Sequence, residues 1–434
     1  MKEIQIGLIG FGTVGTGVVK ILLEKEALLA SLVGTPLKLK RIADLDIKRD
    51  RGILVPQGIL VDQADQILED PEISIVIELV GGLEPARSFI LKALEKGKHV
   101  VTANKALLAH KGDEIFQKAG DCKLDIGFEA SVCGGIPVIL ALQQGIMANE
   151  IESILGIFNG TSNFILTQMT EGELSYSEAL KEAQERGFAE ADPTLDVEGM
   201  DTAHKLSILM HLAYGTPLDP KGFFVEGITR IGPLDIAFAR EFGYCIKLLA
   251  ICRKEGKLLE ARIHPTMIPK THMLANVKGA YNALYICGDS VGDILLYGQG
   301  AGMMPTGSAV VSDLVNIGRN INKEITQRIP PDLAARGFKE KGLALKPFSE
   351  LVTHYYFRFS ALDHPGVLSK IAGILGAHKI SIASVIQKGR KLDGPVAIVM
   401  MTHEAQEADV QKAVQEIDHF KEITDQTVII RVEN

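Results

Sequence analysis

The amino-acid sequence predicts an α/β protein of three domains: a doubly wound parallel sheet, an α+β domain, and a C-terminal βαββαβ unit of the ferredoxin-like type. Three observations support this prediction. The 434 residues correspond to about three domains of ordinary size. Apolar strands alternate with amphipathic helices through the first part of the chain, which is typical of a parallel sheet. The last part instead follows the order strand, helix, strand, strand, helix, strand.

The predicted N-terminal domain covers residues 1–130. It opens with a strand at residues 4–9 that runs into a glycine-rich turn, and apolar side chains then recur with helical spacing at Val14, Val18 and Leu22. Further apolar runs predict the rest of the parallel sheet. The expected strands are residues 37–43, 73–80 and 99–102, and the expected helix is residues 85–96.

The predicted middle domain covers residues 131–340 and mixes both kinds of element. The expected helices are residues 177–186 and 202–214, and the expected strands are residues 151–158 and 257–265. We expect the chain around residues 300–320 to complete the sheet of this domain. The mixture of periodicities predicts an α+β arrangement rather than a second doubly wound sheet.

A linker and a compact unit follow. Residues 323–348 contain Pro330, Pro331 and Pro347 among several charges, which is typical of a linker. The unit at residues 350–434 alternates strands and helices in the order given above. Its expected strands are residues 355–361, 380–388, 396–402 and 427–432, and its expected helices are residues 366–378 and 407–417.

The composition excludes several classes of protein. The 46 basic and 54 acidic residues give a net charge of −8 without a basic stripe, so we expect no nucleic-acid partner. The uncharged residues 130–149 are interrupted by Gly, Pro and Gln, which predicts a loop entering a buried helix rather than a membrane span. The five cysteines include no Cys-x-x-Cys pair, and the start of the chain lacks a secretion signal. We therefore expect a cytoplasmic protein.

The glycine-rich turn predicts a dinucleotide site. Gly10-Phe11-Gly12-Thr13-Val14-Gly15 lies between a strand and an amphipathic helix, where backbone N–H groups can approach a pyrophosphate. This context is that of a Rossmann-type domain. Asp44, at the end of the second strand, is the candidate for the adenosine ribose and would favour NAD. Lys48, Arg49 and Arg51 follow it and would attract a 2′-phosphate, so the choice between NAD and NADP stays open.

A lysine and an acidic loop are the remaining candidates for chemistry. Thr102-Ala103-Asn104-Lys105 places Lys105 at the carboxyl edge of the sheet, where ligands bind in open α/β folds. Residues 187–201 carry five acids and lead into a helix in which Asp201 and Lys205 share one face. The spacing of this pair fits two interpretations equally well. One is a surface ion pair that contributes little to stability. The other is a carboxylate-rich pocket that binds an ammonium group and contains a proton donor. Spacing alone does not separate the two.

Taken in order, the motifs resemble those of the homoserine dehydrogenase family nearly end to end. They are Gly10–Gly15, Thr102–Lys105, Glu129–Pro137, Asn159–Asn163, Glu190–Pro193, Gly199–Lys205 and Gly302–Thr306. Residues 363–368 (Asp-His-Pro-Gly-Val-Leu) make the final unit similar to an ACT domain, a βαββαβ module that senses amino acids. The resemblance implies reversible, nicotinamide-dependent reduction of L-aspartate 4-semialdehyde to L-homoserine, a step toward threonine, methionine and isoleucine.

The same resemblance assigns roles to individual residues. It implies Lys205 as proton donor and acceptor, with Lys105 beside the nicotinamide and the substrate; a positioned ammonium stabilises the negative charge that grows on the aldehyde oxygen as hydride arrives. The implied substrate-binding residues are Glu190, Asp196, Asp201, Gly160 and Thr161. Gly187 and Gly302 join the glycine-rich turn, Asp44 and Lys105 as cofactor-binding residues.

The resemblance also implies a cation, an effector and an assembly. Glu129, Val132, Gly134 and Ile136 match a site for a sodium-like monovalent cation. Asp363, Pro365 and Gly366 form the loop at which ACT domains bind an amino acid, and threonine is the expected feedback effector. An ACT unit and an α+β domain both favour symmetric pairing, so we expect a homodimer or a homotetramer.

Two other functions remain to be separated. An aldehyde-oxidising semialdehyde dehydrogenase would need a cysteine nucleophile, for which Cys133 is the candidate, although no histidine is obviously paired with it. A non-catalytic amino-acid sensor would keep the dinucleotide fold for binding only. Both lysines and the acidic loop count against the sensor.

Overall fold

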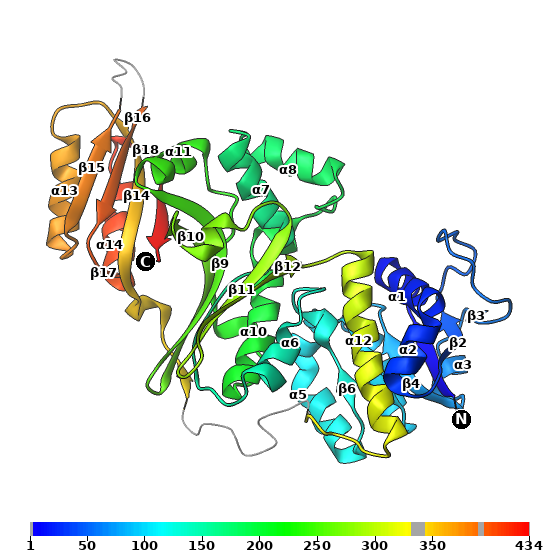
Figure 1. Ribbon diagram of the computed structural model, residues 1–434. Helices are drawn as coiled ribbons and strands as arrows, with labels where there is room; N and C mark the ends of the chain where they lie inside the picture. Colours follow the sequence, from blue (N-terminus) through cyan, green and yellow to red (C-terminus); the bar gives the residue numbers. More distant parts are fainter. Residues whose placement is uncertain (1–2, 331–342, 389–394, 434) are drawn as a thin grey trace. The chain divides into compact units, whose positions relative to one another are not determined.

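The computed structural model describes residues 3–330, 343–388 and 395–433 (Figure 1). The chain forms two compact units. Unit one comprises Met1–Ile154, Asp201–Gly222 and Tyr281–Leu343, and unit two comprises Leu155–Met200, Phe223–Ala280 and Ala344–Asn434. Much of the predicted linker, residues 331–342, lies outside the described residues.

Unit one contains the predicted doubly wound parallel sheet. Its six strands are parallel and lie in the order β3-β2-β1-β4-β5-β6. They are β1 (Ile4–Ile9), β2 (Leu37–Ala43), β3 (Leu60–Val61), β4 (Ile73–Glu78), β5 (His99–Thr102) and β6 (Ile126–Gly127). From β1 the chain continues to β2 and β3 on one side of the sheet. It then crosses to the other side of β1, where β4, β5 and β6 follow in order. The carboxyl ends of β1 and β4 therefore meet at the point where strand order reverses, which is where such sheets bind ligands.

Helices cover this sheet. They are α1 (Thr13–Glu24), α2 (Glu26–Val33), α3 (Asp65–Leu68), α4 (Ala86–Glu95), α5 (Lys105–Cys122) and α12 (Met303–Asn322). The last corrects our expectation that residues 300–320 complete the sheet of the middle domain. Val310, Leu314 and Ile317 are buried at helical spacing, and α12 packs beside α1 (Figure 1). The approach is close, because a Cβ on Gly17 would lie 2.1 Å from the carbonyl oxygen of Met303.

The rest of unit one follows β6. A 3₁₀ turn (Glu129–Ser131) leads to the short helix α6 (Val138–Leu140) and a π-helical turn (Ala141–Gly145), so residues 130–149 form a loop and short helical turns. Within the described parts of the chain, none of the helices is both long and apolar enough to cross a membrane. Helix α10 (Met200–Tyr214) begins at the boundary of the units, and β11 (Tyr281–Gly288) and β12 (Gly292–Gln299) form an antiparallel hairpin.

Unit two begins within β7 (Ile151–Ile157) and builds its first part from helices and one long hairpin. The helices are α7 (Gly160–Glu171), α8 (Tyr176–Glu185), α9 (Thr194–Val197) and α11 (Pro233–Glu241). The strands are β8 (Phe224–Val225), β9 (Tyr244–Glu255) and β10 (Leu258–Pro269), of which β9 and β10 are paired over their whole length.

The C-terminal part of unit two confirms the predicted βαββαβ order. It consists of β14 (Val352–Leu362), α13 (Val367–Ala377), β15 (Ile382–Gln387), β16 (Pro395–Thr402), α14 (Glu407–Asp418) and β18 (Ile423–Val432), in the sheet order β18-β14-β16-β15. Strand β18 also pairs with β10, through Thr266 with Arg431 and Met267 with Val432. The sheet of this module is therefore continuous with the β9–β10 hairpin.

Candidate active site

The glycine-rich turn has the geometry that a dinucleotide needs. Gly10 has a φ of +100°, and a Cβ there would lie 2.6 Å from the carbonyl group of Leu79, while a Cβ on Gly15 would lie 2.3 Å from the oxygen of Gly10. A Cβ on Gly12, by contrast, would meet nothing within 4 Å among the described residues. Gly12 is the cap residue of α1 and has no side chain with which to cap the first amides. Open space and free N–H groups at a helix N-terminus suit a pyrophosphate.

Asp44 and Arg51 lie together beside this turn. Oδ2 of Asp44 accepts a hydrogen bond from the Phe11 N–H at 2.7 Å, and Oδ1 lies 3.1 Å from the Arg51 guanidinium. The guanidinium carbon of Arg51 also lies 4.6 Å from the centre of the Phe11 ring. Lys48 and Arg49 are exposed. Of the three bases after Asp44, Arg51 is therefore the one that is built into the turn.

Helix α5 places Lys105 at the carboxyl edge of the sheet. The Asn104 side chain caps the helix by accepting a hydrogen bond from the Leu107 N–H at 3.1 Å. Asn104 is itself tied to the end of β5, because its N–H donates to the Thr102 hydroxyl at 3.1 Å. That hydroxyl donates to Glu78, a fully buried carboxyl group whose pKa is raised by burial. Glu78 lies within the strand expected at residues 73–80 and was not selected as a site residue from the sequence.

Lys105 and Lys205 share the carboxylate of Asp201, and all three residues belong to unit one. Lys105 Nζ lies 3.0 Å from Oδ1 of Asp201, and Lys205 Nζ lies 2.7 Å from Oδ2. The Lys205 and Asp201 side chains are only 10% and 7% exposed. The pair is therefore a buried one, which favours the pocket over the surface ion pair that spacing had left equally open. The ring of His204 packs edge-on against His110 at 5.1 Å, and burial lowers the pKa of His204.

Cys133 does not have the surroundings of a nucleophile. Its side chain is completely buried, and burial raises the pKa of the thiol to about 11. A reactive cysteine needs a lowered pKa and access to its substrate. All five cysteines, each in the described part of the chain, are free thiols. The geometry thus counts against an aldehyde-oxidising enzyme that uses Cys133.

The loop after Glu129 turns sharply, and the Glu129 carboxylate itself is buried. Cys133 and Gly134 have φ values of +55° and +51°, and the Ile136 N–H donates to the Cys133 carbonyl at 3.0 Å, so the chain turns sharply here. The Glu129 carboxylate is buried and accepts the N–H groups of Ile139 and Leu140 at 2.9 and 2.8 Å. Burial raises its pKa to about 7. The described residues contain no group of three or more His, Cys, Asp or Glu side chains that would hold a metal.

A second acid lies beside Glu129. Asp313, from α12, accepts the backbone N–H of Glu129 at 2.9 Å and is buried, so its pKa is raised to about 8. Gly127 makes room for it, because a Cβ there would lie 2.6 Å from Cβ of Asp313. No motif in the sequence connects residues 184 positions apart, and this neighbour was missed.

In unit two, three of the expected substrate residues come together at the start of α7. Asp196 accepts hydrogen bonds from Asn159 Nδ2 at 2.7 Å and from the Thr161 hydroxyl at 3.0 Å. Gly160 lies between these donors, and a Cβ there would lie 2.8 Å from the carbonyl oxygen of Ala280. Glu190 lies apart from this cluster on an exposed loop, where Gln184 donates to its carbonyl oxygen at 3.2 Å.

Lys247 is a buried residue that sequence reasoning did not select. Its ammonium donates to Asn163 Oδ1 at 3.0 Å and to the carbonyl oxygen of Val277, and Asn163 Nδ2 donates to the carbonyl oxygen of Gly279 at 2.9 Å. Lys247 and Asn163 thus connect α7 to the loop at residues 277–280. The last residue of this loop, Ala280, is the one whose carbonyl oxygen lies close to Gly160. Burial lowers the pKa of Lys247 to about 8.

The remaining predicted residues lie at turns. Gly187 has a φ of +73° just after α8, and Gly302 has a φ of +118° and precedes α12 in unit one. Gly366 has a φ of +96° and precedes α13, so Asp363, Pro365 and Gly366 form the turn from β14 into that helix. Asp363 accepts a hydrogen bond from Gln387 Nε2 at 3.5 Å.

Family models match three stretches of the chain. A model described as homoserine dehydrogenase matches residues 137–315, one described as homoserine dehydrogenase, NAD binding domain, matches residues 10–129, and one described as ACT domain matches residues 355–418. A homoserine dehydrogenase of Neisseria gonorrhoeae is 42% identical over 434 residues, which is 100% of this chain and 99% of that protein.

Solved structures agree. A homoserine dehydrogenase from Thiobacillus denitrificans is 42% identical, with a TM-score of 0.92 over 100% of this chain and 99% of that chain. A hyperthermophilic archaeal homoserine dehydrogenase in complex with NADPH is 27% identical, with a TM-score of 0.63 over 75% of this chain and 100% of that chain.

Proposed function

This chain belongs to the homoserine dehydrogenase family and is an NAD(P)-dependent oxidoreductase, and from this premise we propose that Lys205 is its proton donor and acceptor. The observation that supports the assignment is the buried carboxylate that Lys205 shares with Lys105. Two ammonium groups on one carboxylate leave one net positive charge. A charge of that sign stabilises the oxygen of an aldehyde as it becomes anionic.

The chemistry needs a group that supplies hydride and a group that supplies a proton. The nicotinamide cofactor, when bound, exchanges hydride with the carbon that carries the oxygen. Lys205 gives a proton to that oxygen when the aldehyde is reduced and takes it back when homoserine is oxidised. Asp201 holds the ammonium groups of both lysines in place, since each of its oxygens contacts one of them. Lys105 orients the substrate and adds to the positive charge.

We propose that Glu190 is the carboxylate that receives the substrate's α-ammonium. Its side chain is exposed, and no hydrogen bond to its carboxylate occurs among the described residues. Both oxygens of Asp196, by contrast, already accept hydrogen bonds from Asn159 and Thr161. Asp196 therefore positions Gly160 and Thr161, whose polar groups meet the substrate, and Asp201 acts through the lysines.

We propose that the enzyme accepts both NADP and NAD. The space at Gly12 and the free amides of α1 fit the pyrophosphate that the two share. Asp44 suits the ribose hydroxyl of NAD, but its charge is balanced by Arg51, which removes the repulsion of a 2′-phosphate. The NADPH complex of the archaeal relative supports the phosphorylated cofactor.

We also propose a sodium ion beside Glu129. One carboxylate and the carbonyl oxygens of Val132, Gly134 and Ile136 are the hard oxygen ligands that such cations prefer. The proposal is supported by the sharp turn at Cys133 and Gly134, which lies between these carbonyl groups, and by the burial of the Glu129 carboxylate. A cation there would keep Glu129 ionised despite its burial.

We propose an effector, an assembly and a location for the enzyme. The match to an ACT domain suggests regulation by an amino acid, and we propose threonine as the effector, bound at Asp363, Pro365 and Gly366. We propose a homodimer or homotetramer as the assembly and the cytoplasm as the location.

The test of the activity is a spectrophotometric assay. The purified chain is mixed with L-homoserine and either NAD⁺ or NADP⁺ at alkaline pH, and the absorbance of the reduced cofactor is followed. We expect turnover with both cofactors. Binding of cofactor without turnover would instead favour an amino-acid sensor.

A further inference from the structure

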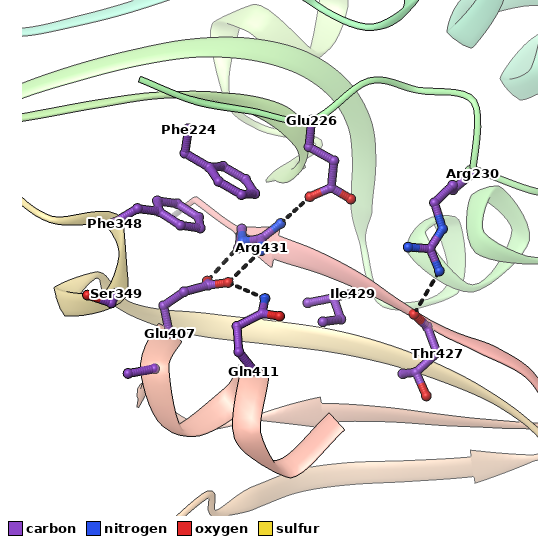
Figure 2. Close-up of a pocket in the computed structure, with 11 residues that line it drawn as sticks. Phe224, Glu226, Arg230, Phe348, Ser349, Glu407, Gln411, Thr427, Ile429 and Arg431 are labelled. Carbon is purple, nitrogen blue, oxygen red and sulfur yellow. Dashed lines mark hydrogen bonds and ion pairs between the residues drawn. The ribbon is translucent and has the colours of Figure 1, made fainter. Parts of the chain in front are cut away.

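A cavity of about 380 Å³ lies within unit two, and none of the residues assigned a role above lines it (Figure 2). We call it the Arg431 cavity. It is lined by residues of β8 and the chain after it, of the turn at residues 348–349, of the start of α14, and of β18. Its volume is in the range of sites for small molecules. Because α14 lies in the ACT-matched residues and β8 does not, a ligand here would contact both parts.

The centre of the cavity is a buried arginine whose charge is already balanced. The Arg431 side chain is 2% exposed, and its guanidinium contacts Glu407 through two nitrogens, at 3.0 and 2.6 Å. A third nitrogen lies 2.6 Å from Oε2 of Glu226. The rings of Phe224 and Phe348, stacked 3.6 Å apart, cover the guanidinium on one side, as Figure 2 shows. The Arg431 side chain is therefore held in one position, and its positive charge is balanced by carboxylates.

Two charged groups at the cavity can still bind a ligand, because their hydrogen-bonding groups are only partly used. Arg230 is exposed and donates one hydrogen bond, at 3.3 Å, to the carbonyl oxygen of Thr427; in the described part of the chain no carboxylate pairs with it. Glu226 uses Oε2 for Arg431, and its Oε1 has no partner among the same residues. One cation and one carboxylate oxygen thus face the same space, together with the apolar side chain of Ile429.

From this arrangement we propose that the Arg431 cavity binds a free α-amino acid with a compact, uncharged side chain. Arg230 binds its carboxylate, Glu226 binds its ammonium group, and Ile429 and the phenylalanines contact its side chain. The two arginines and two glutamates sum to zero charge, which matches a zwitterion. A simple anion would be repelled by Glu226, and a simple cation by Arg230.

This inference rests on the proposed regulation by amino acids for its choice of probes, but it places a ligand away from the loop at Asp363–Gly366. That loop follows the carboxyl end of β14, whereas Glu407 and Arg431 lie at the other end of the module's sheet, where Tyr355 of β14 donates to Glu407 at 2.9 Å and pairs with Arg431. The two sites can therefore be separated by mutation.

The test is isothermal titration calorimetry on the full chain with L-threonine, L-isoleucine and L-methionine as probes. Propionate and ethylamine, each carrying one half of the zwitterion, are the chemical controls. We expect at least one amino acid to bind and neither control to do so at the same concentration. Binding of propionate as tight as that of the amino acids would overturn the zwitterion assignment, as would the lack of binding by all three probes.

Three variants locate the site. Arg230→Gln should weaken binding about tenfold or more, the equivalent of one charge-assisted hydrogen bond, and Arg230→Lys should retain most of it. Ala408→Trp should abolish binding by filling the cavity. Arg240→Gln, an exposed arginine on α11, is the matched control and should bind like the wild type.

Asp363→Asn separates this site from the proposed effector loop. Loss of binding in Asp363→Asn with full binding in Arg230→Gln and Ala408→Trp would overturn the cavity assignment and leave regulation through the loop intact. Binding that depends on Arg230 without any effect on homoserine turnover would support the cavity and count against its regulatory role.

Discussion

The ammonium group of Lys205 lies 2.7 Å from Oδ2 of Asp201, one helical turn earlier in α10, in a setting where both side chains are largely buried. A buried ion pair costs free energy to desolvate, so it is weak support for a purely structural role. The other oxygen of Asp201 holds Lys105, which comes from a different helix. The carboxylate thus fixes two cations at one place.

Replacing Lys205 tests the proton-transfer role. Lys205→Ala should lower kcat for homoserine oxidation by roughly 100- to 10,000-fold, because a general acid–base group contributes about that much. NADP⁺ binding, measured by calorimetry, should change little. Lys181→Ala, an exposed lysine on α8, should have no effect. A Lys205→Ala enzyme with near-normal kcat would reject the assignment.

Replacing Cys133 tests the alternative chemistry. Cys133→Ser should keep homoserine oxidation within a few-fold of the wild type, since the buried thiol has a raised pKa and no part in the proposed mechanism. The measurement is steady-state turnover, with thermal unfolding to account for any loss of packing. A folded variant without turnover would revive the thiol mechanism.

Arg51 should set the preference between cofactors. Arg51→Gln should raise KM for NADP⁺ about tenfold, because a charge-assisted contact to the 2′-phosphate is worth about that much, and should change KM for NAD⁺ far less. Arg49→Gln, on the exposed part of the same loop, serves as the matched control. Equal changes for the two cofactors would mean that Arg51 acts only by supporting the turn at Phe11.

Sodium should stabilise the folded wild-type protein, and this stabilisation should depend on Glu129. In buffers of equal ionic strength, sodium chloride should raise the thermal unfolding midpoint above that in choline chloride, because an ion that binds only the folded chain stabilises it. Glu129→Gln should lose this difference. If the variant responds to sodium like the wild type, the ion binds elsewhere.

Lys247 should make stability depend on pH. Its folded-state pKa is about 8, against an ordinary value of 10.5, so between these values the unfolded chain binds more protons than the folded one. The free energy of unfolding of the wild type should therefore rise with pH in this window relative to Lys247→Met, by at most about 3 kcal/mol. Urea denaturation across the window measures the difference. Lys181→Met should show no such trend, and a flat difference for Lys247→Met would indicate that the buried lysine is charged throughout.

Local periodicity was sufficient for much of the fold. The strands at residues 37–43 and 99–102 match β2 and β5, and the helix expected at residues 85–96 differs from α4 by one residue at each end. Alternation of apolar residues carries this information within a short window. It did not reveal that residues 303–322 form a helix against α1, because the partner lies about 290 positions earlier.

The candidate active site was also predicted only in part, because local spacing carries some of its contacts and tertiary packing the rest. The spacing of Asp201 and Lys205 placed them on one helical face, but the contact of Asp201 with Lys105 depends on how α5 and α10 pack. Asp313 and Lys247 were missed for a related reason. Each lies in a helix or strand that contains other polar residues, and only tertiary contacts distinguish it from a surface position.

The pairing of β10 with β18 bears on attempts to shorten the protein. A chain cut before residue 352 would expose backbone N–H and C=O groups of β10 around Thr266 and Met267, and such unpaired edges promote aggregation. It would also remove Glu433, which contacts the buried guanidinium of Arg262 at 2.8 Å, and leave Glu260, at 2.7 Å, as the remaining carboxylate on that group. A truncated form made to test the proposed regulation would thus need a polar replacement on that edge, and point substitutions in the C-terminal module are the safer route to the same test.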